Sequence, residues 1–400
     1  RKNASDIYGK IKLNKHTDII IEDISDNKEN IIALIEGLSL SHYQFLKYFN
    51  DISKRENKLK TIYVHSKNIS DKELITLKTT IEAVYSARDL VNEPLSYLNT
   101  TKLAEEITNL SKISGFKVEH FNKKKIESLN MNGLLAVNKG SIDDPLFSVL
   151  EWKPENAKNT KPIIIVGKGV VYDTGGLSLK PNNHMLSMKS DMAGGAVTIA
   201  TLYAISKAKL PIHVIGLVPA SDNRPDGNAY VPDDIIRMQN KTSVEVVNTD
   251  AEGRLLLADA LIYAQKYSPE LVIDLATLTG SASNTVSNQA IVAMGNINNK
   301  EFESIKNSGF AVHERIIELP LWDEYNEMIK SEIADIKNVG GSEAGAITAG
   351  KFLEHFVDYP WIHLDIAGVA FNEKIDKYRP QGGTGFGVRL LLDFLSKKIK

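Results

Sequence analysis

The sequence predicts an α/β protein in which a mostly parallel central sheet is flanked by helices and preceded by a smaller N-terminal α/β domain. Three observations support this prediction. Short apolar runs alternate with helical patterns through the second half of the chain, which is typical of parallel strands covered by helices. Residues 1–70 carry a separate α/β pattern rich in Lys and Asn, and residues 71–92 form one long helical pattern between the two regions. We therefore expect an N-terminal domain, a connecting helix and a catalytic domain over 93–400.

The N-terminal domain has two runs with β-branched residues, which predict strands at 16–23 and 59–65. Apolar residues recur at helical spacing between them and predict helices at 28–38 and 41–49. No cluster of chemically reactive residues occurs in this domain, and its many lysines are typical of a solvated surface.

The connecting helix is predicted from an apolar stripe that includes Leu74, Leu77 and Ile81. Ser70 or Asp71 is the expected N-cap, because short polar side chains accept hydrogen bonds from the first free N–H groups. The helix is expected to end before Pro94, since proline cannot continue it.

The catalytic domain is expected to begin with a helix over 102–114, capped by Thr100 or Thr101, and a strand near 116–118. The remaining patterns predict strands at 162–167, 212–218, 244–247, 271–275, 290–294 and 362–366, and helices at 193–208 and 252–267. Ligands of such sheets bind at the carboxyl ends of the strands. The residues whose side chains could bind a ligand or carry out a reaction lie in the loops at these ends.

Composition excludes several classes of protein. The 400 residues are 42% hydrophobic and 24% charged, with a formal net charge of −2, so no bulk charge favours nucleic acid or an anionic membrane. The chain has no cysteine, which excludes disulfides, thiol nucleophiles and Cys-ligated zinc. No leader pattern and no apolar run near the ~18 residues of a membrane span is present, and we expect a cytoplasmic protein. The sequence starts at Arg1 rather than at methionine, which leaves the native N-terminus open.

The segment NTDAEGRLLLADAL, residues 248–261, combines two carboxylates with a glycine and an arginine ahead of an apolar run. The apolar run predicts a buried helix, which places Asp250 and Glu252 in the turn that leads into it. Free N–H groups and the positive end of the helix dipole are found at such a turn, and Arg254 would cover the space in front of the carboxylates. A capping aspartate and a surface arginine would explain this segment alone, so its meaning depends on a second segment.

That second segment is VGKGVVYDTGGLSLKP, residues 166–181. It leaves a predicted strand and supplies Lys168, Asp173 and Lys180, with several glycines that let the backbone turn tightly. The segment KSDMAG follows and places Asp191 at the entrance to a helix.

The three segments together supply four carboxylates, from Asp173, Asp191, Asp250 and Glu252. Four carboxylates in strand-end loops cannot converge without a counter-charge, and two divalent cations would provide it, since oxygen-rich sites suit Zn, Mn or Mg. A lysine beside such cations must be neutral, and burial together with the cations lowers a lysine pKa, so that the amine itself can bind a metal.

In their order and internal spacing, these motifs resemble those of the leucyl (cytosol) aminopeptidase family, which are two-metal exopeptidases. The resemblance covers residues 87–394. It implies that Asp173 and Glu252 bridge both metals. Lys168 and Asp191 would complete the tighter site, and Asp250 the more exchangeable one. The implied metals are Zn, with Mn, Mg or Co possible at the looser site.

The resemblance also implies two catalytic residues. Lys180 would stabilise the oxyanion as it develops, and Arg254 with the neighbouring backbone would hold a bicarbonate ion that shuttles a proton. Both roles are physically reasonable, because a buried cation stabilises developing negative charge and a guanidinium matches a planar bidentate anion. The nucleophile would be a water shared by the two metals, whose pKa falls from ~15.7 towards ~7 in the one-metal precedent.

A substrate side-chain pocket is implied by the same resemblance, lined by Met188, Thr277, Gly280, Ala367 and Ala370. An apolar cavity of this kind would favour an N-terminal Leu or other apolar residue, and the small Ala370 would widen it.

Several other polar residues receive no primary role. We expect Asp259 to be structural, and we leave open whether Asp365 supports the site from behind. No ligand role is assigned to His184, His213, His313 or His363.

The expected partners are short peptides as substrates, and the resemblance implies a homohexamer whose active sites face an internal cavity. Two alternatives stay open. One is a peptidase that prefers Cys-Gly or other dipeptides. The other is a DNA-binding protein on the same scaffold, which the weak net charge and the short N-terminal region disfavour.

Overall fold

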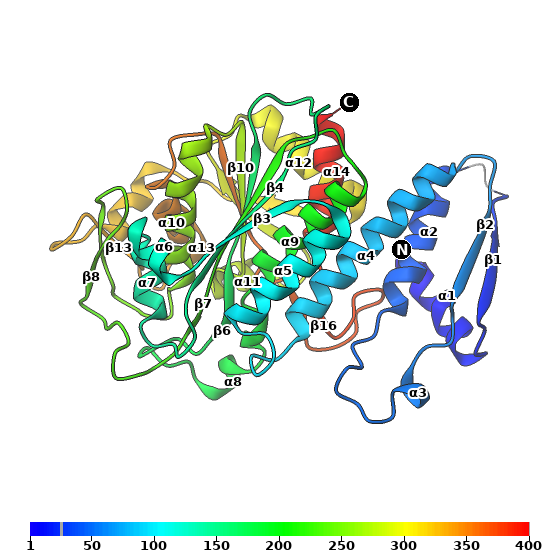
Figure 1. Cartoon of the computed structure of the whole chain (residues 1–400), viewed down its shortest axis with the longest axis horizontal. Helices are drawn as coiled ribbons and strands as arrows, with labels where there is room; N and C mark the ends of the chain where they lie inside the picture. Colours follow the sequence, from blue (N-terminus) through cyan, green and yellow to red (C-terminus); the bar gives the residue numbers. More distant parts are fainter. Residues whose placement is uncertain (25–26, 400) are drawn as a thin grey trace.

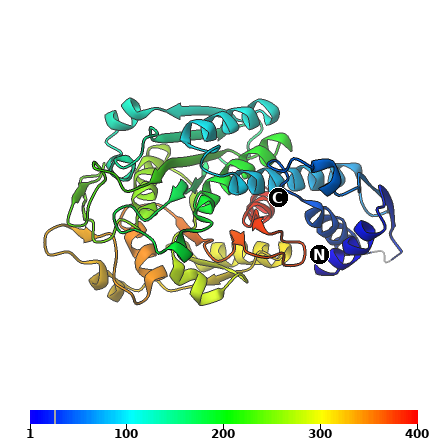
Figure 2. The same ribbon diagram turned by 90° about the horizontal axis from the view of Figure 1, so that it is seen from below.

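The protein consists of an N-terminal part and a larger part that share one long helix (Figure 1). The computed structural model describes residues 1–24 and 27–399. Helix α4, Asp71–Asn92, runs from the N-terminal elements at the right of Figure 1 into the larger part. Figure 2, turned by 90°, shows the N-terminal elements beyond one end of the larger part.

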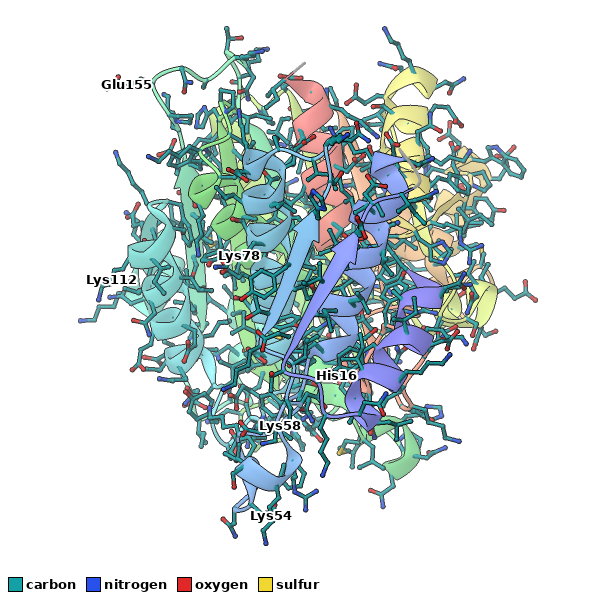
Figure 3. All side chains as sticks on the ribbon, turned by 90° about the vertical axis from the view of Figure 1, so that its right-hand side faces the viewer. His16, Lys54, Lys58, Lys78, Lys112 and Glu155 are labelled. Atoms are coloured by element: carbon teal, nitrogen blue, oxygen red, sulfur yellow. The ribbon has the colours of Figure 1, made fainter. Side chains whose placement is uncertain are left out.

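The N-terminal part has a small core of its own, formed by residues such as Tyr8, Ile21 and Leu38. Its two strands pair in parallel and face the viewer in Figure 3, where Lys54 and Lys58 lie beyond one end of the sheet. The elements are α1 (Lys2–Leu13), β1 (Asp18–Glu22), α2 (Lys28–His42), α3 (Ile52–Arg55) and β2 (Thr61–His65).

One expectation for this part needs correction, and one helix escaped prediction. The predicted helix over 41–49 is wrong, because α2 ends at His42 and the next residue turns away from helical geometry. There the Tyr43 hydroxyl donates to Asp89 Oδ1 at 2.6 Å, and this contact with α4 overrides the local helical spacing. Helix α1 was not predicted from its mixed sequence.

Helix α4 is anchored at its start and along its length. Ser70 caps it as predicted: the Ser70 hydroxyl accepts from Glu73 N, and the Glu73 carboxylate accepts from Ser70 N, which is a capping box. Farther along, the buried Arg88 donates to Leu40 O at 2.9 Å and to Thr384 O at 3.0 Å. One side chain therefore links α4 to both parts of the protein.

The central sheet has the strand order β12-β11-β14-β10-β5-β7-β4-β3, with β6 paired to the end of β7. Strands β14, β10, β5 and β7 run parallel, whereas β3, β4 and β11 join their inner neighbours in antiparallel fashion. The strands are β3 (Lys117–Phe121), β4 (Leu146–Trp152), β5 (Ile163–Gly167), β6 (Gly169–Asp173), β7 (Val214–Asn223), β10 (Leu271–Ala276), β11 (Ile291–Gly295), β12 (Ile316–Glu318) and β14 (Trp361–Asp365). The predicted α/β class with a mostly parallel, helix-flanked sheet is confirmed.

Helices cover both faces of this sheet and enclose two apolar cores. Helices α4, α9 and α14 contribute to one core, and α7, α10 and α13 to the other. The helices of the larger part are α5 (Thr100–Ser114), α6 (Lys123–Ser128), α7 (Asn132–Asn138), α8 (Asn182–Met185), α9 (Ala193–Lys207), α10 (Gly253–Ala264), α11 (Gly280–Val286), α12 (Asn299–Val312), α13 (Gly345–Glu354) and α14 (Val388–Lys398).

The smaller elements complete the larger part. They are β8 (Ile235–Arg237), β9 (Ser243–Glu245), β13 (Ile336–Lys337), β15 (Phe371–Asn372) and β16 (Gly382–Gly383), with short 3₁₀ turns at Met188–Ser190, Gln265–Tyr267 and Asp323–Ile329. The expected cap of α5 is corrected, since Asn99 rather than Thr100 or Thr101 accepts from Lys102 N.

The N-terminus of α9 lies very close to the sheet. A Cβ added to Gly194 would overlap the carbonyl oxygen of Leu275 on β10, whereas one added to Gly195 would lie 3.1 Å from the nearest atoms. Gly195 N also donates to Lys168 O at 2.8 Å. The missing side chains therefore let the helix start directly at the carboxyl ends of β5 and β10.

Among residues 1–24 and 27–399, none of the helices combines the length and apolar character that a membrane span requires.

Replacing Gly194 with Ala should destabilise the protein more than replacing Gly195 with Ala. The first change forces α9 off the sheet, and overpacking of this kind costs about 1–3 kcal/mol. In Gly195→Ala, small shifts of the neighbouring atoms can relieve the contact of the new Cβ, and alanine has a helix propensity more favourable than that of glycine by about 1 kcal/mol. Thermal unfolding of the two variants measures the difference, and equal melting temperatures would contradict the close packing described here.

Candidate metal centre

The acidic and basic residues singled out in the sequence meet at the carboxyl ends of the strands. Lys168 follows β5 and Asp173 is the last residue of β6. Asp191 lies two residues before the start of α9, and Glu252 occupies the N-cap position of α10. The side chain of Asp250 is partly exposed, whereas the other four residues are buried.

Lys168 lies between two carboxylates from different loops. Its Nζ is 2.8 Å from Asp191 Oδ2 and 2.8 Å from Glu252 Oε1, and it donates to Thr277 O at 3.0 Å. Gly253 makes room for this lysine, because a Cβ at that position would overlap the Lys168 side chain.

Lys180 links the other two carboxylates. Its Nζ is 2.8 Å from Asp173 Oδ2 and 2.5 Å from Asp250 Oδ1. The two lysines therefore divide the four acids into two pairs, one deep in the site and one nearer its opening, where the Lys180 side chain is 14% exposed.

The donor set fits divalent cations. Carboxylate oxygens of Asp173, Asp250 and Glu252 lie within 4.8 Å of one another, and Asp191 joins them through Lys168. Asp191 Oδ2, Asp250 Oδ1 and Glu252 Oε1 are buried, and within residues 1–24 and 27–399 their polar partners are the lysine ammonium groups. Four carboxylates exceed the two lysines by two charges, and buried charge that lacks a partner is strongly unfavourable.

The pKa shifts also reflect this excess of buried carboxylates. Burial raises the pKa of Asp173 to about 7, helped by the nearby Glu252 charge, and burial also raises the pKa values of Asp191 and Asp250. Burial alone would raise the pKa of Glu252, but Lys168 and Lys180 outweigh it and leave that pKa lowered. The site thus holds carboxylates that repel one another and that a cation would stabilise.

The loop that carries Asp173 and Lys180 is held by a network from neighbouring segments. Gly175 adopts a φ of +87°, which side chains rarely adopt, and its N–H donates to Asp173 Oδ1 at 2.8 Å. Asn223 Nδ2 donates to the same oxygen at 2.8 Å. Ser178 and Thr249 exchange hydrogen bonds through N–H groups and hydroxyls, so this loop is tied to the one that carries Asp250.

Arg254 has one hydrogen-bonding edge engaged and one free. Its Nη1 donates to Asn338 O at 2.7 Å, whereas its buried Nε has no hydrogen-bond partner among the residues that the structure describes. Burial lowers the pKa of Arg254 to about 10, which leaves the guanidinium charged at neutral pH. A buried cation with a free N–H edge fits a small planar anion.

The Asn338 side chain clamps the loop before α10. Its Oδ1 accepts from Val247 N at 2.7 Å, and its Nδ2 donates to Asn248 O at 2.7 Å. Sequence reasoning missed Asn338 and Asn223. No local motif marks Asn338, whereas Asn223 ends a strand at the carboxyl edge of the sheet, a position that could have indicated it.

The residues expected to line a substrate pocket come from three places around the centre. Thr277 belongs to the loop after β10 and Gly280 is the first residue of α11, whereas Ala367 and Ala370 belong to the turn after β14. These loops are neighbours, since Ile366 N donates to Ala276 O at 2.8 Å. Met188 lies in the short turn before Asp191, and its carbonyl accepts from Asp191 N.

The residues set apart in the sequence also have defined places. The Asp259 carboxylate accepts from Leu134 N at 2.8 Å and holds α7 against α10. His363 is fully buried and its Nδ1 is 2.6 Å from Asp274 Oδ1, away from the cluster of acids.

A model of the cytosol aminopeptidase family, catalytic domain, matches residues 85–392. A probable cytosol aminopeptidase from Chlorobaculum tepidum is 47% identical, over 92% of this chain and 75% of the relative. One from Geobacter sulfurreducens is 42% identical, over 93% and 75%. One from Chlorobaculum parvum is 51% identical, over 78% of this chain and 62% of the relative. The predicted family resemblance is confirmed.

Solved structures give the same match. The bottromycin maturation enzyme BotP in complex with Mn has a TM-score of 0.92 and 29% sequence identity, and it aligns with 100% of this chain and 87% of its own. A second structure of BotP has a TM-score of 0.91 at 30% identity, with coverage of 99% and 86%.

Zn²⁺ or Mn²⁺ should stabilise the wild-type chain against unfolding. Binding to the folded state alone adds about 2.7 kcal/mol when the free metal is 100-fold above its dissociation constant. Glu252→Gln and Asp173→Asn should lose most of this gain. Asp259→Asn, which alters a buried carboxylate outside the cluster, should keep it. Thermal unfolding with and without metal, together with elemental analysis, measures the effect. Equal metal content in all four proteins would rule out the cluster as the binding site.

Proposed function

The chain belongs to the cytosol aminopeptidase family and is a metal-dependent aminopeptidase of the leucyl aminopeptidase type, and from this premise we propose how its site works. The enzyme removes the N-terminal residue, preferably Leu or another apolar residue, from short peptides. The observation that carries this proposal is the convergence of four carboxylates, largely buried, on only two lysines.

Two divalent cations would occupy the centre. Asp173 and Glu252 would bridge them, Lys168 and Asp191 would complete the tighter site, and Asp250 the looser one. When bound, the cations supply a polarised carbonyl and a water acidic enough to act as nucleophile near neutral pH. Lys168 must give up the proton that its carboxylate partners favour before its Nζ can serve as a ligand.

The identity of the metals is proposed from chemistry and similarity. Carboxylate oxygens with a lysine amine suit Zn, and also Mn, Mg or Co at the looser site. Manganese is supported by the BotP structure, which contains Mn.

Lys180 would stabilise the negative charge that develops on the carbonyl oxygen. Its Nζ is held by Asp173 and Asp250 at the more open side of the cluster, where a substrate carbonyl can approach. The carboxylates outweigh burial and raise the pKa of Lys180, so the amine stays protonated and can donate a hydrogen bond.

Arg254 would hold a bicarbonate ion with the adjacent backbone. Its contact with Asn338 O fixes the guanidinium, and the unpartnered Nε leaves an N–H edge for a planar oxyanion. When bound, bicarbonate supplies a base beside the nucleophile, which the cluster otherwise lacks because its own carboxylates would face the metals.

Substrate selection is proposed to depend on Met188, Thr277, Gly280, Ala367 and Ala370. They surround the first side chain of the peptide, and the small Ala367 and Ala370 leave room for a branched apolar group. By family resemblance we also propose a cytoplasmic homohexamer, with residues 93–400 as its catalytic domain and residues 71–92 as the connection to an N-terminal domain of 1–70.

Lys180→Ala should keep its metals and lose turnover of Leu-p-nitroanilide by about 10²- to 10³-fold, as removal of an oxyanion donor does. Glu252→Ala should lose metal and rate together. Lys207→Ala, which removes a lysine paired with Glu82 far from the centre, should behave as wild type. Initial rates and metal content of the three variants test these roles. Full activity of the wild type after exhaustive chelation would refute the metal-dependent mechanism.

Arg254→Ala should reduce turnover and abolish any response to added bicarbonate. A positioned base contributes about 10²- to 10⁴-fold, and the wild type should lose part of that factor in bicarbonate-depleted buffer and regain it on addition. Arg224→Ala, which alters an arginine paired with Asp222, is the control. The decisive measurement is the rate at several bicarbonate concentrations. A wild-type rate that is independent of bicarbonate would remove this assignment while leaving the metal centre intact.

A further inference from the structure

The last residue of β14, Asp365, is a buried carboxylate that lies outside the metal cluster. It is 1% exposed, and it accepts three hydrogen bonds from two loops. Its Oδ1 accepts from Leu278 N at 3.2 Å and from Ala367 N at 3.1 Å, and its Oδ2 accepts from the Thr279 hydroxyl at 2.7 Å. One side chain therefore joins the loop after β10 to the turn after β14.

The loop after β10 is also tied to the metal cluster at its other end. The Thr277 hydroxyl donates to Asp191 Oδ1 at 2.8 Å, and Thr277 O accepts from Lys168 Nζ at 3.0 Å. The next two residues are held by Asp365. The short segment 277–280 is thus fixed between the cluster on one side and Asp365 on the other.

The turn after β14 packs against the helix that this segment begins. A Cβ on Gly368 would overlap Ser287 O at the end of α11, so the turn and the helix approach closely. Thr279 caps α11, since its hydroxyl accepts from Ala282 N at 2.9 Å while donating to Asp365. The position of α11 relative to the turn therefore depends on the same carboxylate.

A second buried pair lies behind Asp365 on the same face of β14. The His363 ring is bonded to Asp274, and Asp274 Oδ2 accepts from Trp361 Nε1 at 2.6 Å. These residues form a fully buried polar network earlier on the strand that ends in Asp365, and such a network makes this part of the sheet rigid.

We propose that Asp365 is a positioning residue that fixes the loops holding the substrate's first side chain relative to the metal centre, and that it thereby sets the preference for a large apolar N-terminal residue. The proposal rests on the aminopeptidase function proposed above. It predicts an effect on selectivity, because a shift of the two loops changes the fit of a branched side chain more than that of a methyl group.

The test compares kcat/KM for Leu-p-nitroanilide and Ala-p-nitroanilide in the metal-loaded enzyme. Asp365→Ala removes all three hydrogen bonds and should lower the Leu-to-Ala ratio by about tenfold or more, chiefly through a higher KM for the Leu substrate. Asp365→Asn should restore much of the ratio, because its amide oxygen can still accept from Leu278 N and Ala367 N. Metal content should equal that of wild type in both variants.

Two further variants distinguish an effect on substrate selectivity from a general effect on folding. Asp259→Asn alters another buried carboxylate that accepts a backbone N–H, and it should leave the ratio unchanged. Thr279→Val removes the hydroxyl donor, and it should lower the ratio in a manner that is not additive with Asp365→Asn, since the two share one hydrogen bond.

The outcomes separate the two proposals. A wild type that hydrolyses neither substrate refutes the aminopeptidase function itself. An active wild type with a ratio in Asp365→Ala within twofold of its own refutes the positioning role. Equal losses for both substrates, accompanied by loss of metal, would also refute it, because the residue would then support the fold rather than selectivity.

Discussion

An excess of buried negative charge at the carboxyl edge of one sheet is the constraint on which the rest of this structure depends. Lys168 and Lys180 each bridge two carboxylates, yet two negative charges remain without a balancing group. Water cannot relieve this repulsion, because most of the oxygens involved are buried. Cations therefore stabilise the arrangement and, once bound, also provide the chemistry. Folding and function of this region share one electrostatic requirement.

The surrounding architecture is explained by the need to bring distant loops to this edge. Parallel strands place their carboxyl ends side by side, so the residues that follow β5 and β10 and those that precede α9 become neighbours despite long sequence separations. Close approach of α9 to the sheet at Gly194 sets how deeply Asp191 sits. Helix α10 adds its positive N-terminal end beneath Glu252. The backbone thus determines the geometry before any metal binds.

Many of the strands, helices and charged loop residues around this centre could be predicted from the sequence, because local sequence patterns indicate them. The strand before Lys168 and the helix after Arg254 are continuous apolar runs, and the spacing of charged residues within each loop is short. The predicted helix over 41–49 is wrong because Tyr43 finds its partner on α4, a contact that no local pattern reveals. The roles of Asn223 and Asn338 could not be predicted for a related reason. Asparagine is common in loops, and only the folded chain shows that these two hold Asp173 and the loop before Arg254.

The segment 277–280 connects the proposed metal centre with the residue proposed to control substrate selectivity, Asp365. Thr277 contacts both Lys168 and Asp191, whereas Leu278 and Thr279 contact Asp365. Residues 277–279 thus connect the cluster of acids to Asp365, which also accepts from the turn after β14. A connection of this kind matters because a misplacement of about 1 Å can cost 10²-fold in rate. If Ala367 and Ala370 line the pocket as proposed, substitutions at these positions would change the size of the accepted side chain without moving the metals, as long as Asp365 holds the two loops in place.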